Sequence, residues 1–144
     1  MDQKTPPERQ FDFWLGEWDV SWGEGQQGSN RIDRILDGKV IREQFDGSPA
    51  LSFRGLSLSV YDAQAELWRQ TWVDTEGNYW AFTGGFEDGR MTLSTEVQAD
   101  GKPIQLRMVF FNIAADELDW HWERSEDGGR NWELRWHIHY SRRK

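Results

Sequence analysis

The chain has 144 residues, no cysteine, and a formal net charge of −8 from 17 Lys and Arg against 25 Asp and Glu. This length suits a single domain, residues 1–144, whose hydrophobic core is large enough to be stable without disulfide bonds or bound metals. Without cysteine, disulfides, thiolate metal sites and thiol nucleophiles are excluded, and a cytoplasmic location is the expectation. The acidic balance repels a phosphate backbone, and the sequence has no apolar run of about 18 residues, so we expect neither nucleic acid nor a membrane as partner.

The segment 11–20, Phe-Asp-Phe-Trp-Leu-Gly-Glu-Trp-Asp-Val, changes from helical to strand periodicity. Its first apolar residues recur at spacings of three and four, which predicts a short helix that starts at one of two prolines and ends at about Trp14. From Trp18 on, apolar and polar residues alternate, as in a half-buried strand. Gly16 lies at the change, where a glycine lets helix and strand approach closely. Residues 1–7 are expected to form a flexible arm.

The rest of the chain consists of alternating segments separated by short turn sequences such as Asp37-Gly38. Strands at this spacing, with no helix long enough for a crossover, predict an all-β antiparallel meander. About ten strands should close into an up-and-down β-barrel, with more interior room than eight strands leave. The expected strands span residues 17–22, 30–36, 39–45, 51–61, 67–74, 79–86, 90–97, 104–112, 118–123 and 132–140.

Five motifs spread over the chain resemble an uncharacterised, mostly bacterial, calycin-like family that is distantly similar to lipocalins, fatty-acid-binding proteins and nitrobindin. Calycins pair a Gly-x-Trp step in the first strand with a basic residue at the end of the last strand. The resemblance therefore implies a lipocalin-like barrel that Gly16, Trp18 and Arg142 close at one end, and it transfers no catalytic residue. The motifs are FDFWLGEW at 11–18, GLSLSVYD at 55–62, WRQTWVD at 68–74, SEDGGRNW at 125–132 and YSR at 140–142.

Residues 125–132 also resemble an Asp box, Ser-x-Asp-x-Gly-x-Thr-Trp, with Asn131 in place of the usual Thr. In sialidase propellers this motif recurs blade by blade, whereas here it occurs once in a chain too short for a propeller. We carry over only the turn, in which the Ser and Asp side chains accept hydrogen bonds from backbone amides.

One face of the strand 67–74 alternates indoles with polar side chains. Apolar walls with a few orienting polar groups are what a small-molecule pocket requires, and the ten tryptophans exceed what a core of this size is expected to absorb. The alternative, a stripe facing solvent, would leave two indoles bare in water. We therefore predict binding of a small, partly hydrophobic ligand in an aromatic-lined cavity. The predicted ligand-binding residues are Trp68, Gln70, Trp72, Asp74, Tyr61, Ser57, Ser59 and Tyr140.

Two other functions are open at this point. An enzyme could use Asp74 or Glu43 with Tyr61 in acid–base chemistry, provided that two titratable groups reach one substrate atom. Because Asp74 precedes a turn, however, a role at the barrel rim in bonding turn amides is the expectation, and no catalytic residue is assigned. A carbohydrate-binding module is the other alternative, and an exposed aromatic platform would favour it.

His137 and His139 share one face of the last predicted strand, and His121 lies on the strand before it. Such histidines can ligate a metal, and a barrel histidine can hold haem iron, as in nitrobindin. Since Trp132, Leu134, Trp136, Ile138 and Tyr140 form the apolar face and should point inward, the period of two places the histidines outside. No metal or cofactor is therefore expected, and haem becomes an alternative only with the opposite register. A small molecule is the expected partner, and homodimer formation is left open.

Overall fold

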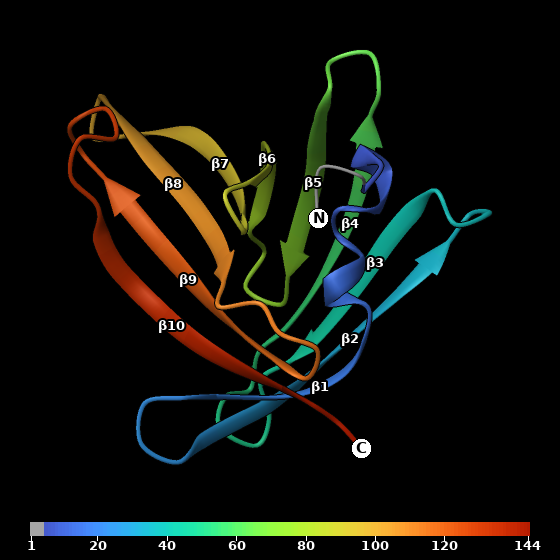
Figure 1. The fold of residues 1–144 in the computed structure, drawn as a ribbon. Helices are drawn as coiled ribbons and strands as arrows, with labels where there is room; N and C mark the ends of the chain where they lie inside the picture. Colours follow the sequence, from blue (N-terminus) through green and yellow to red (C-terminus); the bar gives the residue numbers. More distant parts are fainter. Residues whose placement is uncertain (1–4) are drawn as a thin grey trace.

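The computed structural model describes residues 5–144 as one closed barrel of ten antiparallel strands (Figure 1). Each strand pairs with its neighbours in sequence, and the last strand pairs with the first. The predicted fold class is therefore confirmed. The strands are β1 (Gly16–Trp22), β2 (Gln26–Ile35), β3 (Val40–Asp46), β4 (Arg54–Asp62), β5 (Leu67–Asp74), β6 (Tyr79–Glu87), β7 (Arg90–Ala99), β8 (Lys102–Phe111), β9 (Glu117–Ser125) and β10 (Glu133–Arg142).

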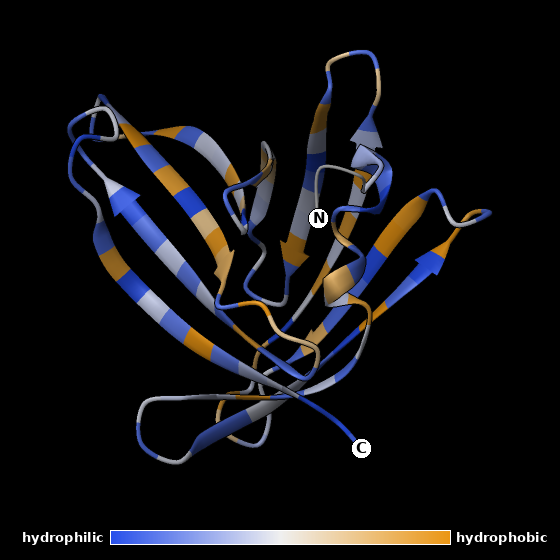
Figure 2. Cartoon of the chain, in the orientation of Figure 1, coloured by the Kyte–Doolittle hydropathy of each residue, from blue (hydrophilic) through white to orange (hydrophobic). Residues whose placement is uncertain are grey.

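Hydrophobic and hydrophilic bands alternate along several strands, as the period of two requires (Figure 2). Two strand starts differ most from the prediction: β2 begins at Gln26, four residues before the predicted residue 30, because it pairs with β1 from Gln26 on. The other is β4, which begins at Arg54 because residues 47–53 form a hydrogen-bonded loop. In this loop the Gly47 amide donates to the Phe53 carbonyl, and the Leu51 amide donates to the Gly47 carbonyl, both at 2.8 Å. These amides are satisfied within the loop, so the strand starts after it.

The predicted N-terminal helix consists of two short 3-10 turns, η2 (Pro7–Arg9) and η3 (Asp12–Trp14). Part of the predicted arm, residues 1–4, lies outside the described residues, and Pro7 already belongs to η2. No helix in the described part of the chain is both long and apolar enough to cross a membrane. The cytoplasmic location and the homodimer stay predictions.

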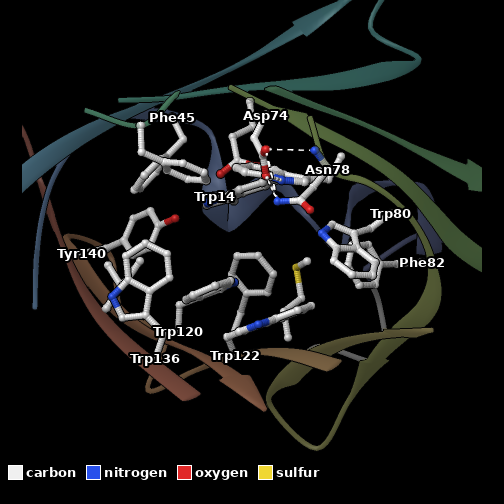
Figure 3. Close-up of a pocket in the computed structure, with 16 residues that line it drawn as sticks. Trp14, Phe45, Asp74, Asn78, Trp80, Phe82, Trp120, Trp122, Trp136 and Tyr140 are labelled. Carbon is white, nitrogen blue, oxygen red and sulfur yellow. Dashed lines mark hydrogen bonds between the residues drawn. The ribbon is translucent and has the colours of Figure 1, made fainter. Parts of the chain in front are cut away.

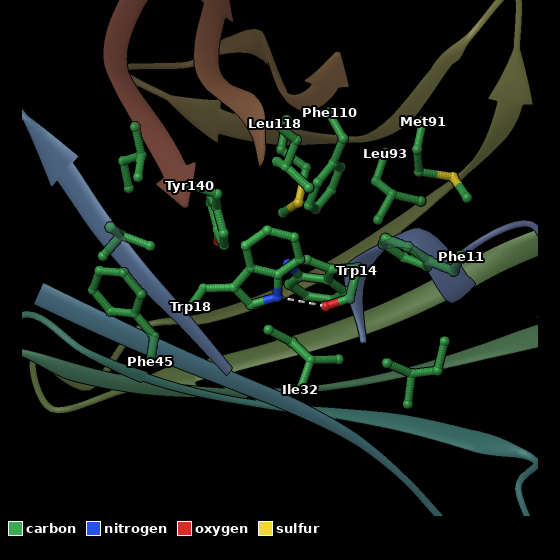
Figure 4. Packing of buried hydrophobic residues seen from close by; sticks show 14 of the residues in the cluster. Phe11, Trp14, Trp18, Ile32, Phe45, Met91, Leu93, Phe110, Leu118 and Tyr140 are labelled. Carbon is green, nitrogen blue, oxygen red and sulfur yellow. Dashed lines mark hydrogen bonds between the residues drawn. The ribbon is translucent and has the colours of Figure 1, made fainter. Parts of the chain in front are cut away.

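The N-terminal turns plug one half of the barrel with aromatic side chains (Figure 4). Phe11 stacks on Trp14 with ring centroids 4.8 Å apart and meets Trp68 and Phe110 edge to face at 5.3 and 5.2 Å. All four side chains are at most 2% exposed. Such edge-to-face pairs stabilise the fold by about 0.5–1.5 kcal/mol each beyond the effect of the area that they bury. The buried aromatic rings fill the interior in this half of the barrel.

The closure between β1 and β10 brings Gly16, Trp18 and Arg142 together. The Arg142 guanidinium lies over the Trp18 ring at 4.1 Å and donates to the Leu15 carbonyl at 2.7 Å. Gly16 has a φ of +126°, and a Cβ at this position would lie 2.4 Å from Arg142 Nη1. The glycine therefore both supplies a backbone conformation that other residues rarely adopt and leaves room for the guanidinium.

One prediction about β10 is wrong. Trp132 and Leu134 were expected to point inward with the rest of the apolar face, but Leu134 is 51% exposed and Trp132 packs against the guanidinium of Arg107 at 3.9 Å, outside the barrel. The cause is a β-bulge between Leu134 and Trp136, where one extra residue shifts the pairing with β9. A bulge reverses the parity of the residues before it, so only those from Trp136 on face the interior.

The turn before β10 has the geometry that the Asp-box resemblance implies. Asp127 Oδ1 accepts hydrogen bonds from the amides of Arg130 at 3.0 Å and Asn131 at 2.9 Å, and Ser125 Oγ accepts from the Gly129 amide at 2.9 Å. Asn131 also donates its side-chain amide to Asp127 Oδ2 at 2.7 Å. The motif thus stabilises the hairpin turn through side-chain hydrogen bonds to backbone amides.

Candidate functional site

The half of the barrel that the N-terminal turns leave free contains a cavity of about 210 Å³ (Figure 3). Twelve of its lining residues are aromatic or aliphatic, and the polar ones are two acids, an amide and a phenol. Side chains from opposite walls face one another across it. The lining residues are Trp14, Glu43, Phe45, Phe53, Trp72, Asp74, Asn78, Trp80, Phe82, Met108, Phe110, Trp120, Trp122, Trp136, Ile138 and Tyr140.

Six of these side chains form what we call the aromatic collar, a nearly continuous circuit of rings around the cavity. Neighbouring centroids along it are 5.8–6.5 Å apart, and its two ends, Trp72 and Trp80, are opposite each other in the pairing of β5 with β6. All the collar tryptophans are only half-buried although they point into the barrel, so the collar surrounds the mouth. In order around the barrel, the collar consists of Trp72, Phe45, Trp136, Trp120, Trp122 and Trp80.

The position of Trp72 in the collar depends on a glycine of the neighbouring strand. A Cβ on Gly55 would lie 2.1 Å from Cη2 of the Trp72 indole, well inside van der Waals contact. Gly55 therefore provides the space that the outer edge of this indole occupies beside β4.

The floor of the cavity carries a buried polar cluster. Glu43 is 7% exposed, and its carboxylate accepts hydrogen bonds from Asn30 Nδ2 at 2.8 Å and from Ser57 Oγ at 2.7 Å. Asn30 Nδ2 also donates to the hydroxyl of Tyr140 at 2.8 Å. Cross-strand pairing explains this meeting, since Glu43 is opposite Ser57 in the pairing of β3 with β4.

Glu43 is an acid without a counter-ion. Burial raises its pKa from 4.5 to about 7, and the hydrogen bonds from Asn30 and Ser57 offset only part of that rise. Burial and the nearby Glu43 also raise the pKa of the Tyr140 hydroxyl, which stays neutral at physiological pH. Within residues 5–144, no lysine, arginine or histidine lines the cavity. The floor thus combines a titratable carboxyl with neutral donors in a low-dielectric setting.

Asp74 lies at the rim and organises the turn after β5. Its Oδ1 accepts from the amides of Glu76 at 2.9 Å and Asn78 at 3.1 Å, and its Oδ2 accepts from Trp72 Nε1 at 2.8 Å. Burial alone would raise the pKa of Asp74, but the hydrogen bonds from Trp72, Asn78 and Glu76 outweigh it and lower the pKa. The carboxylate is therefore ionised at neutral pH and poorly suited to act as a base.

Three of the predicted ligand-binding residues, Trp72, Asp74 and Tyr140, line the cavity. Trp68 is buried against Phe11 of the plug and against Tyr61, at centroid distances of 5.3 and 5.7 Å, so that it is a core residue and no cavity wall. The reason is the N-terminal plug, whose side chains fill the barrel at that level.

The other predicted binding residues, Gln70, Ser57, Ser59 and Tyr61, also do not line the cavity. Gln70 Nε2 donates to Ser59 Oγ at 3.0 Å, both residues being buried, and Ser57 acts indirectly by donating to Glu43. The period of two predicts which side chains point inward, but an inward-pointing side chain does not necessarily reach the cavity.

The sequence reasoning missed most of the collar. Trp120 and Trp122 alternate on β9, and Trp80 and Phe82 alternate on β6, so the same signal that singled out β5 was present on these strands. That they meet across the barrel depends on closure and register, which strand patterns alone do not provide.

The structure does not bring the predicted acid–base groups together. Tyr61 is opposite Trp68 and Asp74 is opposite Gly55 in the pairing of β4 with β5, a separation of six residues or about 20 Å along the strands. Glu43 is opposite Ser57, four residues or about 13 Å from Tyr61. Proton transfer requires hydrogen-bond distance, so neither acid can share a substrate atom with Tyr61.

The three histidines lie outside the barrel. His137 Nε2 and His139 Nδ1 both approach Asp119 Oδ1, at 3.0 and 2.9 Å, and His121 Nδ1 lies 3.1 Å from Glu123. In the described part of the chain, no cluster of three or more side chains is arranged to hold a metal ion. From Trp136 on, the register of β10 is the expected one, and no histidine lines the cavity within residues 5–144.

No protein-family model matches the chain, and no curated protein matches it. The resemblance to the calycin-like family therefore stays a prediction from the motifs.

Proposed function

We propose that this protein binds a small, partly apolar molecule in the barrel cavity, without catalysing a reaction on it. The observation that carries the proposal is an unfilled interior of about 210 Å³ with an aromatic collar at its mouth and a polar cluster on its floor. Apolar walls with a few convergent polar groups are the general form of a ligand site.

The polar cluster on the floor supports this proposal. Glu43 and Tyr140 line the cavity, and both are held in place by hydrogen bonds from Asn30. A bound molecule would therefore meet fixed polar groups among apolar walls. The volume corresponds to about seven waters at about 30 Å³ each, which limits the enclosed part of a ligand to a small group.

The structure gives no support to a sugar-binding platform. The large hydrophobic side chains that are strongly exposed in residues 5–144 are aliphatic ones and Tyr79, with no tryptophan among them. A platform for a sugar needs a ring that is open to solvent, whereas the collar tryptophans are half-buried and face one another across the mouth of the cavity.

Intrinsic fluorescence and thermal stability test the proposal. A ligand that enters the collar should shift the tryptophan emission and raise the melting temperature, since binding to the native state alone stabilises it. Trp120→Ala, which opens the collar, should abolish the response. Trp132→Ala is the matched control, because Trp132 packs on Arg107 outside the barrel. If a broad set of small apolar and amphiphilic compounds leaves both signals unchanged, the proposal is wrong.

A further inference from the structure

We propose that the cavity recognises a quaternary ammonium head group, held by the aromatic collar and by the carboxylate of Glu43. This inference rests on the proposed function and adds the chemical class of the ligand. It draws on three features of the cavity: the collar rings, the charged groups that line it, and the small number of hydrogen-bond acceptors that remain free on its floor.

The collar offers several π-faces to a single group. Trp120 meets Trp136 at an interplanar angle of 84° and a centroid distance of 5.8 Å, and Phe45 meets Trp136 at 84° and 6.1 Å. Trp120 and Trp122 are parallel within 3°. Rings that meet at right angles around a space form a box, and the negative π-faces of tryptophans attract a cation more strongly than those of other aromatic residues.

The charges that line the cavity all have one sign. Its ionisable acids are Glu43 on the floor and Asp74 at the rim, and in the described residues no basic side chain joins them. Asp74 is hydrogen-bonded to the turn, but no cation offsets the charge of Glu43. An ionised carboxylate at a buried site is costly unless it is paired, and a cation bound above it would supply the missing partner.

The scarcity of acceptors favours a methylated ammonium over a primary one. A primary ammonium carries three N–H donors that each need an acceptor on binding. The carboxylate of Glu43 uses two of its about four acceptor sites for Asn30 and Ser57, and the Tyr140 hydroxyl uses one of two for Asn30, so few acceptors remain for three donors. The walls are indoles, phenyl rings and aliphatic groups. A quaternary ammonium has no N–H to leave unsatisfied, and its methyl groups suit such walls.

Isosteric probes test the inference on the wild-type protein. Choline, the neutral 3,3-dimethylbutan-1-ol and the anionic 3,3-dimethylbutanoate share one branched head and differ in charge, and ethanolamine is choline without its methyl groups. At pH 8 and constant ionic strength, calorimetric or fluorescence titration should show choline binding at least about tenfold more tightly than each of the others.

Glu43→Gln identifies the contribution of the carboxylate. This variant should weaken choline binding by about tenfold or more and leave the neutral alcohol unchanged, and Glu87→Gln, which removes an exposed charge, should change neither. In the wild type, choline affinity should rise from pH 6 to pH 8, because Glu43 becomes ionised in this range. In Glu43→Gln it should stay constant. Of the groups that face Glu43, Asn30 and Ser57 do not titrate, Tyr140 stays neutral, and Asp74 at the rim stays ionised in this range.

Three outcomes would overturn the inference, and they can be told apart. Binding of the alcohol or the anion as tightly as choline would refute the cation and leave the ligand-binding function standing. A preference for choline that survives Glu43→Gln would remove Glu43 from the recognition. If none of the probes and none of the compounds of the broader set binds, the proposed function fails with the inference.

Discussion

Glu43→Gln should make the protein more stable at pH 8 and leave its stability nearly unchanged at pH 4.5. The substitution replaces a carboxyl group that lies in the barrel floor, 7% exposed and without a counter-ion, by an amide of the same shape. Glutamine can keep both hydrogen bonds, because its carbonyl accepts from Asn30 and the Ser57 hydroxyl can rotate to accept from its amide.

The magnitude follows from the pKa of Glu43, which rises from 4.5 in the unfolded chain to about 7 in the barrel. Between these values the folded protein keeps a proton that the unfolded chain has released, so the free energy of unfolding of the wild type falls as the pH rises through this window. At about 1.4 kcal/mol per pKa unit, the full loss above pH 7 is about 3 kcal/mol. The glutamine variant has no such loss and should exceed the wild type by up to about this amount at pH 8.

Urea unfolding at a series of pH values between 4.5 and 8 measures the difference. Every other titrating group contributes equally to the wild type and the variant, so the difference isolates Glu43, and Glu87→Gln serves as the control for the loss of one acidic charge. A difference between variant and wild type that is the same at pH 5 and pH 8 would refute the reasoning, since it would show that Glu43 titrates alike in the folded and unfolded states.

Three further substitutions test the packing of the collar and of the closure. Gly55→Ala should displace the indole of Trp72, lower the free energy of unfolding by about 1–3 kcal/mol in urea titrations and change the tryptophan emission; an unchanged spectrum would contradict it. Gly16→Ala should cost about 1–3 kcal/mol because of its positive φ and its contact with Arg142, and a stability equal to that of the wild type would speak against this closure. Asp74→Asn should lose about 1–3 kcal/mol at pH 7, because an amide cannot accept from all the turn donors. Since the pKa of Asp74 is lowered by folding, its stabilising effect is present above the unfolded pKa and is lost as the pH falls through the folded one, so the gap should narrow in acid unfolding curves.

What the sequence alone determined is the local architecture. The period of two and the Asp-Gly turns predicted the number of strands, their order and their antiparallel pairing, and β5 has the predicted bounds. The parity of β4 and β5 also turned Ser57 and Trp72 inward as expected. These features follow from short-range rules, in which each residue depends on neighbours a few positions away.

What only the tertiary structure decided is how the interior is divided between core and cavity. Trp68 and Trp72 have the same parity on one strand, yet the first packs against Phe11 of the plug and the second belongs to the collar. The bulge in β10 turned Leu134 outward, although its pattern is as regular as that of its neighbours. The meeting of Glu43 with Tyr140 through Asn30 joins strands that are far apart in the sequence. Barrel closure and register set these distances, and they depend on all ten strands at once.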